Sequence, residues 1–173
     1  MLALCDESSE VEIWKVPANG VGTPEQITKN AEVLRWEAIP SPDGRYIAHH
    51  DKNQRLWLYD VERKKESKLD ESEIDQFYDL RWSPDSRWLA CVAVASNLYS
   101  RIWIYGVADG SKTAVTSDRY DSWSPAWSAD GEWLYFLSDR NLRSVVTSPW
   151  GSMQPEPFFD KKSRVYQIAL REG

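Results

Sequence analysis

Short runs of apolar residues alternate with clusters of turn-forming residues along the whole chain. Runs of three to five apolar residues occur at 46–48, 88–92 and 133–137, and Ser, Pro, Asp or Gly residues precede each of them. Runs of this length are typical of strands that are buried on both faces. No segment repeats apolar residues every three or four positions over three turns, which is the pattern of an amphipathic helix. The chain is therefore predicted to be all-β.

A tight-turn motif precedes each of these runs, at spacings of 42 and 45 residues. It reads Ser41-Pro42-Asp43-Gly44, Ser83-Pro84-Asp85-Ser86 and Ser128-Ala129-Asp130-Gly131. In such a turn Pro presets φ, Ser and Asp side chains bond the nearby backbone, and Gly tolerates positive φ. Ser86 and Ala129 depart from the motif, which is expected to weaken those two turns. The predicted structural turn positions are Ser41, Asp43, Gly44, Ser83, Asp85, Ser128, Asp130 and Gly131.

Aromatic residues keep a fixed distance from these turns. Five residues before each turn serine lie Trp36, Tyr78 and Trp123, and five residues after it lie Tyr46, Trp88 and Trp133. A further register holds Trp14, Trp57 and Trp103, spaced 43 and 46 residues apart. Large flat rings suit the space between stacked sheets. We therefore predict packing between units for Trp14, Trp57, Trp103, Trp36, Tyr78, Trp123, Trp88 and Trp133.

The repeat divides the chain into units of the size of a propeller blade, which has four strands in about 40–45 residues. The approximate units are 1–30, 31–72, 73–118 and 119–160, followed by a strand-like tail at 161–173. The first unit is truncated, because it lacks the turn motif and the innermost strand before it. The predicted fold is an all-β partial β-propeller of about four blades, each a four-stranded antiparallel sheet.

Composition narrows the possible functions. The 42% hydrophobic content can bury enough apolar surface for a folded domain. The net charge of −6 argues against a nucleic-acid binder, which would need a basic face. No apolar run approaches the roughly 20 residues that cross a bilayer, and no export leader is visible. The two cysteines, Cys5 and Cys91, are too few for a disulfide framework and are expected to be buried thiols, which favours the cytoplasm.

Few residues suggest chemistry. His49 and His50 are neighbours on a predicted strand and point to opposite faces, so ordinary strand roles are expected for both. We predict no catalytic residue, no metal ligand and no cofactor. The turns also fail to match sialidase-type Asp boxes, because Asp43-Gly44 and Asp130-Gly131 lack the residue between Asp and Gly that those boxes have. Arg140 and Arg143 lie where a ring opening could meet peptide carboxylates, although local salt bridges with Asp139 are the expected role.

Two segments resemble the propeller repeat of the TolB family and of tricorn-type serine peptidases. They are Trp-Ser-Pro-Asp-Ser-Arg-Trp-Leu-Ala at 82–90 and Trp-Ser-Ala-Asp-Gly-Glu-Trp-Leu-Tyr-Phe-Leu-Ser-Asp-Arg at 127–140. The stretches 39–48, 137–140 and 148–160 are more similar to tricorn peptidases and their homologues, and 148–160 resembles part of the second, larger propeller of that family. The resemblance covers nearly the whole chain.

The resemblance implies a non-catalytic propeller segment that guides or gates peptide substrates to a catalytic core that this chain lacks. The implied partners are peptides and the rest of the parent peptidase, with no nucleic acid and no membrane. A TolB-like module that docks a protein partner is the alternative, and a propeller enzyme such as a glycosidase or lyase is a third hypothesis.

An incomplete propeller would expose blade edges, which natural proteins avoid. Either the tail at 164–170 adds to the first unit, or two chains pair through their open ends. Self-association is the preferred expectation.

Overall fold

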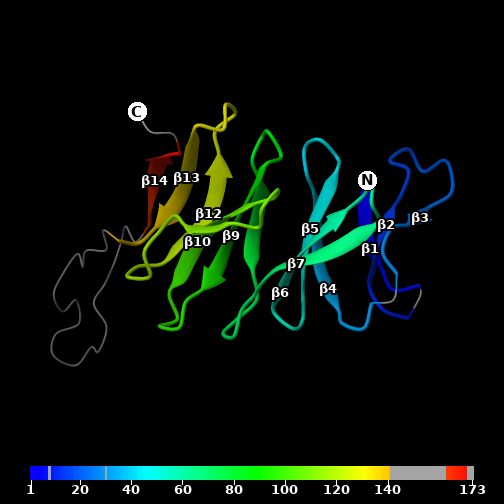
Figure 1. Ribbon diagram of the computed structural model, residues 1–173, viewed down its shortest axis with the longest axis horizontal. Coiled ribbons are helices and arrows are strands. Elements are labelled where there is room, and N and C mark those ends of the chain that lie inside the picture. The colour runs from blue at the N-terminus through cyan, green and yellow to red at the C-terminus, as the bar shows by residue number, and fades with distance from the viewer. Residues whose placement is uncertain (8, 30, 141–162, 171–173) are drawn as a thin grey trace, which may run out of the picture.

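The computed structural model describes residues 1–7, 9–29, 31–140 and 163–170, which form four antiparallel sheets and contain no helix (Figure 1). The first sheet holds β1 (Leu2–Cys5), β2 (Glu12–Lys15) and β3 (Glu25–Gln26). The second holds β4 (Arg35–Pro40), β5 (Tyr46–Asp51), β6 (Arg55–Asp60) and β7 (Lys65–Glu71). The third holds β8 (Tyr78–Trp82), β9 (Trp88–Val94), β10 (Ser100–Gly106) and β11 (Lys112–Ala114). The fourth holds β12 (Ser122–Trp127), β13 (Trp133–Ser138) and β14 (Arg164–Ala169).

Each sheet is a meander, because strands that follow one another in the sequence are also neighbours in the sheet. The sheets themselves succeed one another along the molecule in chain order, from β1 at one end to β14 at the other (Figure 1). The turn motifs join the first two strands of each of the last three sheets, at Ser41, Ser83 and Ser128. The all-β fold predicted from the apolar runs is confirmed.

The tail differs from its prediction. β14 pairs with β13 along its whole length, from Trp133 opposite Ala169 to Ser138 opposite Arg164, so it is the third strand of the fourth sheet. Of the two ways considered to close the incomplete propeller, the addition of this segment to the first unit is therefore wrong, and the preferred one, self-association, stays a prediction. The pairing is favoured because it stacks Tyr166 on Phe136, with ring centroids 5.8 Å apart. Residues 141–162, including the 148–160 stretch, lie outside the described part of the chain.

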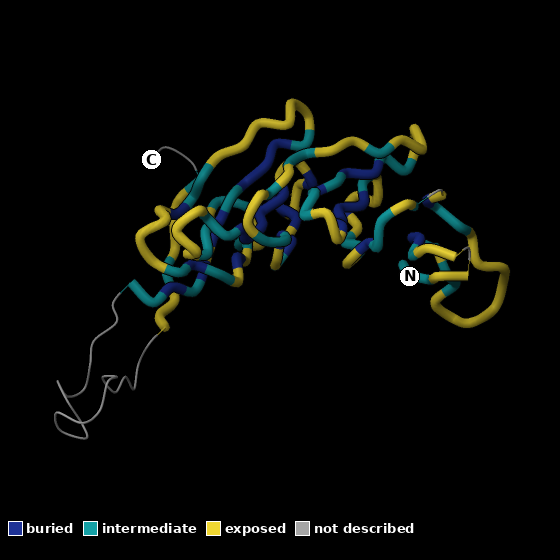
Figure 2. The backbone as a smooth tube through the Cα atoms, turned by 90° about the horizontal axis from the view of Figure 1, so that it is seen from below, coloured by how far each residue is buried: buried dark blue, intermediate teal, exposed yellow. Residues whose placement is uncertain are grey.

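The core lies between neighbouring sheets. One apolar cluster joins the first two sheets around Ile13 and Ile47, one joins the second and third around Leu56 and Leu80, and one joins the third and fourth. Figure 2 shows the same distribution, with buried segments inside and exposed ones at loops and edges. Cys91 belongs to the middle cluster and is fully buried, whereas Cys5 is half-buried, and both are free thiols. Burial raises the pKa of the Cys91 thiol, which makes it unreactive.

Candidate functional site

The three turn motifs share one hydrogen-bond pattern. The serine hydroxyl donates to the aspartate Oδ1, at 2.6 Å for Ser41, 2.6 Å for Ser83 and 2.5 Å for Ser128. The same serine Oγ accepts the backbone N–H of the residue that begins the next strand, at 2.9–3.0 Å. The aspartate Oδ1 also accepts the N–H two residues on, at 2.9–3.1 Å. In each of the last three sheets, these hydrogen bonds therefore fix the conformation of the turn between the first strand and the second.

Ser86 has a role that its departure from the motif did not predict. It adopts φ of 61°, in the left-handed region where Gly44 and Gly131 each have φ of 73°. Its hydroxyl accepts the N–H of Asp43 at 3.1 Å, across the boundary between the second and third sheets. Ser86 thus adopts an unfavourable backbone conformation, and its side chain adds a hydrogen bond between two units.

The first strand of each of the last three sheets carries a bulge at the same position. The ladder shifts register after Trp36, Tyr78 and Trp123. The next residues, Glu37, Asp79 and Ser124, have φ of 55°, 52° and 51°. Such a repeated left-handed residue bends the strand and redirects its side chain.

Polar groups of neighbouring first strands meet at these bulges. The Ser124 N–H donates to Asp79 Oδ2 at 2.9 Å, which links the fourth sheet to the third. Neighbouring protein atoms displace part of the water around the Glu37 carboxyl, which raises its pKa; Arg81 opposes this rise, and Asp79 adds to it. These three charged residues therefore share one electrostatic environment, although they belong to two different sheets.

Two indoles join the first strands to one another. Trp82 Nε1 donates to the Ile39 carbonyl at 2.9 Å, and Trp127 Nε1 donates to the Arg81 carbonyl at 3.0 Å. Each tryptophan directly precedes a turn serine, and each reaches the equivalent carbonyl of the preceding sheet. Sequence reasoning missed this pair, although the repeated Trp-Ser step at 82–83 and 127–128 carried the signal.

The eight predicted inter-unit aromatics fall into two groups. Trp36 (41% exposed), Tyr78 (36%), Trp88 (38%) and Trp133 (36%) keep large exposed surfaces. These four residues lie at or near the start of their strands, beside the bulges and turns, and their packing between units stays a prediction. The half-buried group comprises Trp14, Trp57, Trp103 and Trp123.

The half-buried rings have polar as well as apolar neighbours. Trp57 stacks on His49 with ring centroids 6.5 Å apart, and its Nε1 donates to Asp51 at 2.8 Å. Trp103 packs against the core between the second and third sheets and contacts two cations, Arg101 and Lys112. Trp123 packs against the core between the third and fourth sheets.

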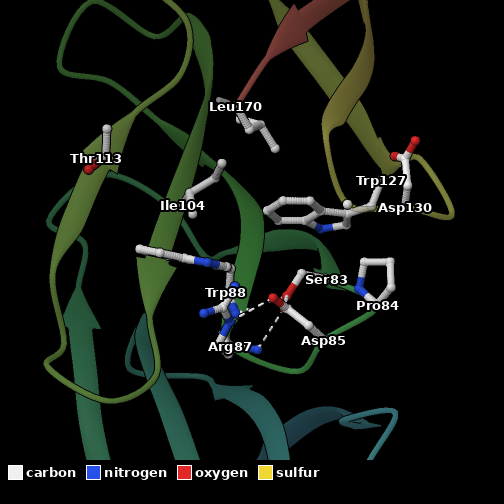
Figure 3. Close-up of a pocket in the computed structure, with 11 residues that line it drawn as sticks. Ser83, Pro84, Asp85, Arg87, Trp88, Ile104, Thr113, Trp127, Asp130 and Leu170 are labelled. Carbon is white, nitrogen blue, oxygen red and sulfur yellow. Dashed lines mark hydrogen bonds and ion pairs between the residues drawn. The ribbon is translucent and has the colours of Figure 1, made fainter. Parts of the chain in front are cut away.

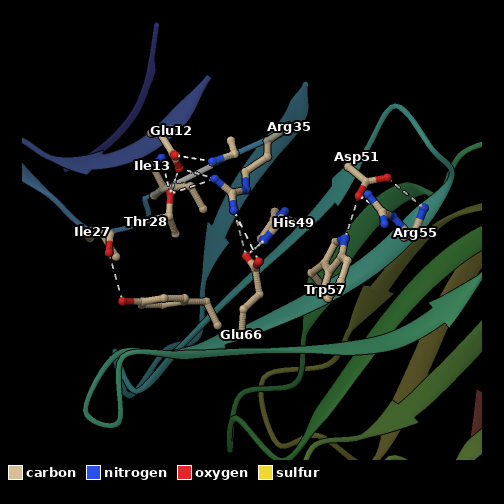
Figure 4. Close-up of polar contacts among 12 residues, drawn as sticks. Glu12, Ile13, Ile27, Thr28, Arg35, His49, Asp51, Arg55, Trp57 and Glu66 are labelled. Atoms are coloured by element: carbon tan, nitrogen blue, oxygen red, sulfur yellow. Dashed lines mark hydrogen bonds and ion pairs between the residues drawn. The ribbon is translucent and has the colours of Figure 1, made fainter. Parts of the chain in front are cut away.

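A buried polar network fastens the first sheet to the second (Figure 4). The Glu12 carboxylate accepts hydrogen bonds from Thr28 Oγ1 at 2.6 Å, from the Ala31 N–H at 2.7 Å, and from the Arg35 guanidinium, which also forms an ion pair with it. The Arg35 guanidinium also forms an ion pair with Glu66 at 3.3 Å, and the Glu66 carboxylate is hydrogen-bonded to His49 Nε2 at 2.6 Å. These residues come from four strands and one loop, so the network depends on the sheets being in place.

A similar polar contact links the second sheet to the third. Tyr105 on β10 donates its hydroxyl to Asp70 Oδ2 at 2.5 Å, and Lys112 Nζ lies 2.6 Å from the same oxygen. The corresponding Tyr59 on β6 donates to the Ile27 carbonyl of the first sheet at 3.0 Å. A tyrosine on the third strand of a sheet thus reaches back to the preceding sheet in both places.

The histidine and arginine side chains that were considered for chemistry make contacts within the fold. His49 is held by Glu66, and His50 is buried, which together with the neighbouring His49 lowers the pKa of His50 to about 4. In the described residues no three His, Cys, Asp or Glu side chains gather as a metal ion would require. The Arg140 guanidinium lies 4.5 Å from the Tyr166 ring centroid, over the fourth sheet. Arg143 is outside the described residues.

The whole chain matches one protein family. Residues 1–173 fit the model of the tricorn protease second beta propeller domain. The chain belongs to this family. It is therefore a propeller segment of the tricorn type, as the resemblance at 39–48, 137–140 and 148–160 implied.

Relatives and solved structures agree with the family. A putative tricorn-like protease C-terminal subunit from Sulfurisphaera tokodaii is 34% identical over 114 residues, which is 65% of this chain and 13% of the relative. A tricorn protease homolog from Saccharolobus solfataricus is 29% identical over 114 residues, 65% of this chain and 11% of the relative. The crystal structure of the tricorn protease superposes with a TM-score of 0.74 at 18% identity, covering 92% of this chain and 15% of that one.

The fold is shared more widely. A putative TolB from Agrobacterium tumefaciens superposes with a TM-score of 0.61 at 21% identity, covering 95% of this chain and 55% of that one. The tricorn-type segment thus spans a small part of its tricorn relatives and a larger part of a TolB-like protein. Among its described residues, none forms a helix that is long and apolar enough to cross a membrane.

Proposed function

We propose that this chain is a non-catalytic segment of a tricorn-like peptidase that guides or gates peptides on their way to a catalytic core elsewhere in the parent protein. The observation that carries the proposal is the row of polar side chains at the bulges of β4, β8 and β12. Glu37, Arg81 and Ser124 are exposed and Asp79 is half-buried.

In a propeller the blades surround a central channel. The first strands β8 and β12 contact each other, as expected for strands that converge on such an axis. These polar groups interrupt the aromatic surface that Trp36 and Tyr78 expose beside the bulges, so an extended peptide meets a wall with no continuous apolar surface to which it could adhere. Such a wall suits passage rather than tight binding, because affinity depends on well-packed, desolvated anchors.

Polar contacts between the sheets hold the strands around this wall in a rigid arrangement. Indole hydrogen bonds from Trp82 and Trp127 join successive first strands, and the Glu12–Arg35–Glu66 network joins the first sheet to the second. A rigid frame would hold the bulge residues at fixed places, as a guide requires.

The test uses the parent peptidase with a cysteine at Ser124. Ser124→Cys is coupled to a bulky maleimide in a variant of the parent that lacks Cys5 and every other accessible cysteine, while the buried Cys91 stays unreactive. We expect cleavage of a long unfolded polypeptide to slow, with cleavage of a small chromogenic amide unchanged, because only the long chain needs the full passage. The matched control carries the same label on Ala108→Cys. Ala108 is an exposed residue in the connection between β10 and β11. Equal slowing of both substrates, or of neither, would refute the guiding role.

The TolB-like fold favours one second candidate, a module that docks a protein partner on a propeller face. The same labelled parent separates the two functions. A docking module would lose partner binding when a propeller face is labelled and would show no dependence of cleavage on substrate length.

A further inference from the structure

A cavity of about 820 Å³ opens between the first and second sheets. Its volume falls in the range of ligand-binding pockets, about 300–1,000 Å³. Arg35 and Glu66 of the buried network form part of its lining. Three lysines also line it: Lys15 at the end of β2, Lys29 in the connection that follows β3, and Lys64 in the turn between β6 and β7.

The charges of the three lysines are not neutralised within the described part of the chain. No described carboxylate forms an ion pair with Lys15, Lys29 or Lys64, and all three residues are exposed. The Arg35 guanidinium, by contrast, is buried and bound to two glutamates of the network. The lysines are therefore the cations of the lining that a ligand could pair with.

The charge balance of the lining is positive. Four cations line the cavity against two carboxylates, Glu25 and Glu66, and Glu25 lies directly opposite Lys15 in the pairing of β3 with β2. Glu12 binds Arg35 without lining the cavity, and counting it still leaves four cations against three carboxylates. This excess is opposite in sign to the net charge of the chain, which is −6. The cavity therefore attracts anions.

A second pocket, of about 420 Å³ between the third and fourth sheets, has a different lining (Figure 3). Arg87, the one cation among its described lining residues, is paired with Asp85 at 2.7 Å. Indole and aliphatic side chains make up much of the remainder. The group of unpaired lysines thus belongs to the boundary between the first two sheets and is not a general feature of the spaces between sheets.

The arrangement of the lysines favours an anion that carries several charges along a chain. A lysine ammonium is a point charge on a flexible stem, and the guanidinium that could hold a phosphate by two hydrogen bonds is already bound to carboxylates. Because the lysines lie on three separate segments, each can meet a different charged group of an extended ligand. Ile27 and Val61 also line the cavity and offer apolar surface to the aliphatic part of such a ligand. A peptide with closely spaced aspartate or glutamate residues has these properties.

We propose that the cavity between the first and second sheets binds an acidic segment of a peptide, whose carboxylates pair with Lys29 and Lys64. None of the bulge residues lines the cavity, so this binding site is separate from the proposed passage. The choice of a peptide as the ligand rests on the peptide-handling function proposed above. The site adds a preference for acidic segments, which passage along the bulges does not require.

The test is an NMR titration of the 15N-labelled chain with acetylated, amidated tetrapeptides of the sequence Ala-Glu-Ala-Glu or Ala-Gln-Ala-Gln. We expect the backbone N–H signals of Ile27, Val61 and Lys64 to shift with the Glu peptide, and that of Leu89 in β9 to stay unchanged. Replacing both Glu residues by Gln should weaken binding at least about tenfold, because two charge-assisted contacts are lost. Binding of the Glu peptide should also weaken at high salt.

Two double variants with the same net charge provide a matched comparison. Lys29→Gln with Lys64→Gln removes two lysines of the lining and should weaken binding of the Glu peptide at least about tenfold. Lys52→Gln with Lys65→Gln removes two exposed lysines that do not line the cavity and should change the affinity by less than about twofold. The folded state of each variant is checked by the dispersion of its amide spectrum.

Equal affinity for the Glu and Gln peptides would overturn the proposal. Equal weakening by the two double variants would also overturn it, because the net charge of the chain would then explain the binding. Inorganic phosphate is titrated in parallel, and tighter binding of phosphate than of the Glu peptide would overturn the assignment to a peptide.

The titration does not depend on cleavage by the parent protein. Absence of Glu-peptide binding with intact length-dependent cleavage would refute this site alone, and the reverse result would refute the passage alone.

Discussion

Removal of the Arg35 guanidinium should detach the first sheet from the second. In Arg35→Met the Glu12 carboxylate, whose side chain is 2% exposed, keeps only its bonds from Thr28 and Ala31. A buried charge that loses its partner typically destabilises a protein by about 3–5 kcal/mol. Since Glu66 also loses a contact with Arg35, we expect a decrease in the free energy of unfolding of about that size.

The measurement is urea unfolding of the chain, followed by circular dichroism, together with hydrogen exchange. Exchange should accelerate at the Ile13 N–H, which donates to Thr28 Oγ1 at 2.8 Å within the network, and stay slow in the third sheet. Arg63→Met is the matched control, because Arg63 is 76% exposed and its pair with Asp60 is 3.5 Å long. An exposed pair contributes about 0–1 kcal/mol.

A double variant adds a second check. Glu12→Gln combined with Arg35→Met removes the lone charge and should recover part of the lost stability. If Arg35→Met costs no more than Arg63→Met, or if protection falls equally in all four sheets, the network does not fasten the first sheet to the second.

Two other perturbations test separate parts of the frame. Tyr105→Phe removes the hydroxyl that donates to Asp70 at 2.5 Å, and urea unfolding should show a loss of about 1.5–3 kcal/mol, as for a hydrogen bond to a charged group; a loss no larger than that of Tyr99→Phe, an exposed tyrosine, would contradict this. The pKa of His50 is about 4 in the folded chain, against an ordinary 6.5, so the unfolded chain takes up the proton first. The contribution of the neutral His50 to the free energy of unfolding is complete above pH 6.5. It is lost as the pH falls towards 4, by up to about 3 kcal/mol. The free energy of unfolding, measured across this range, should depend less on pH in His50→Gln than in the unaltered chain. An unchanged dependence would show that His50 does not cause the loss of stability.

Local features of the fold were readable from the sequence. The turn motif specifies its own hydrogen bonds within six residues, so the serine and aspartate positions at 41 and 43 could be assigned by inspection. The apolar runs at 46–48, 88–92 and 133–137 identified the second strand of each of the last three sheets, because a strand buried on both faces needs apolar residues in succession. By contrast, the bulge residues Glu37, Asp79 and Ser124 share a backbone conformation but no side-chain type, so no residue pattern marked them.

Contacts between residues of different strands were harder to predict. The Glu12–Arg35 pair joins residues that lie in different sheets, and His49 reaches Glu66 only because β5 and β7 flank β6. The sequence left the partner strand of the tail open, because a long segment separates β13 from β14 and strand order could not be inferred from spacing.

The most direct test of the guiding role is an experimental structure of the full-length parent protein. We predict that β4, β8 and β12 line a continuous passage towards the catalytic core, with Glu37 and Ser124 exposed and Asp79 half-buried along its wall. The account would be contradicted if these bulges were packed against another domain, with no passage beside them.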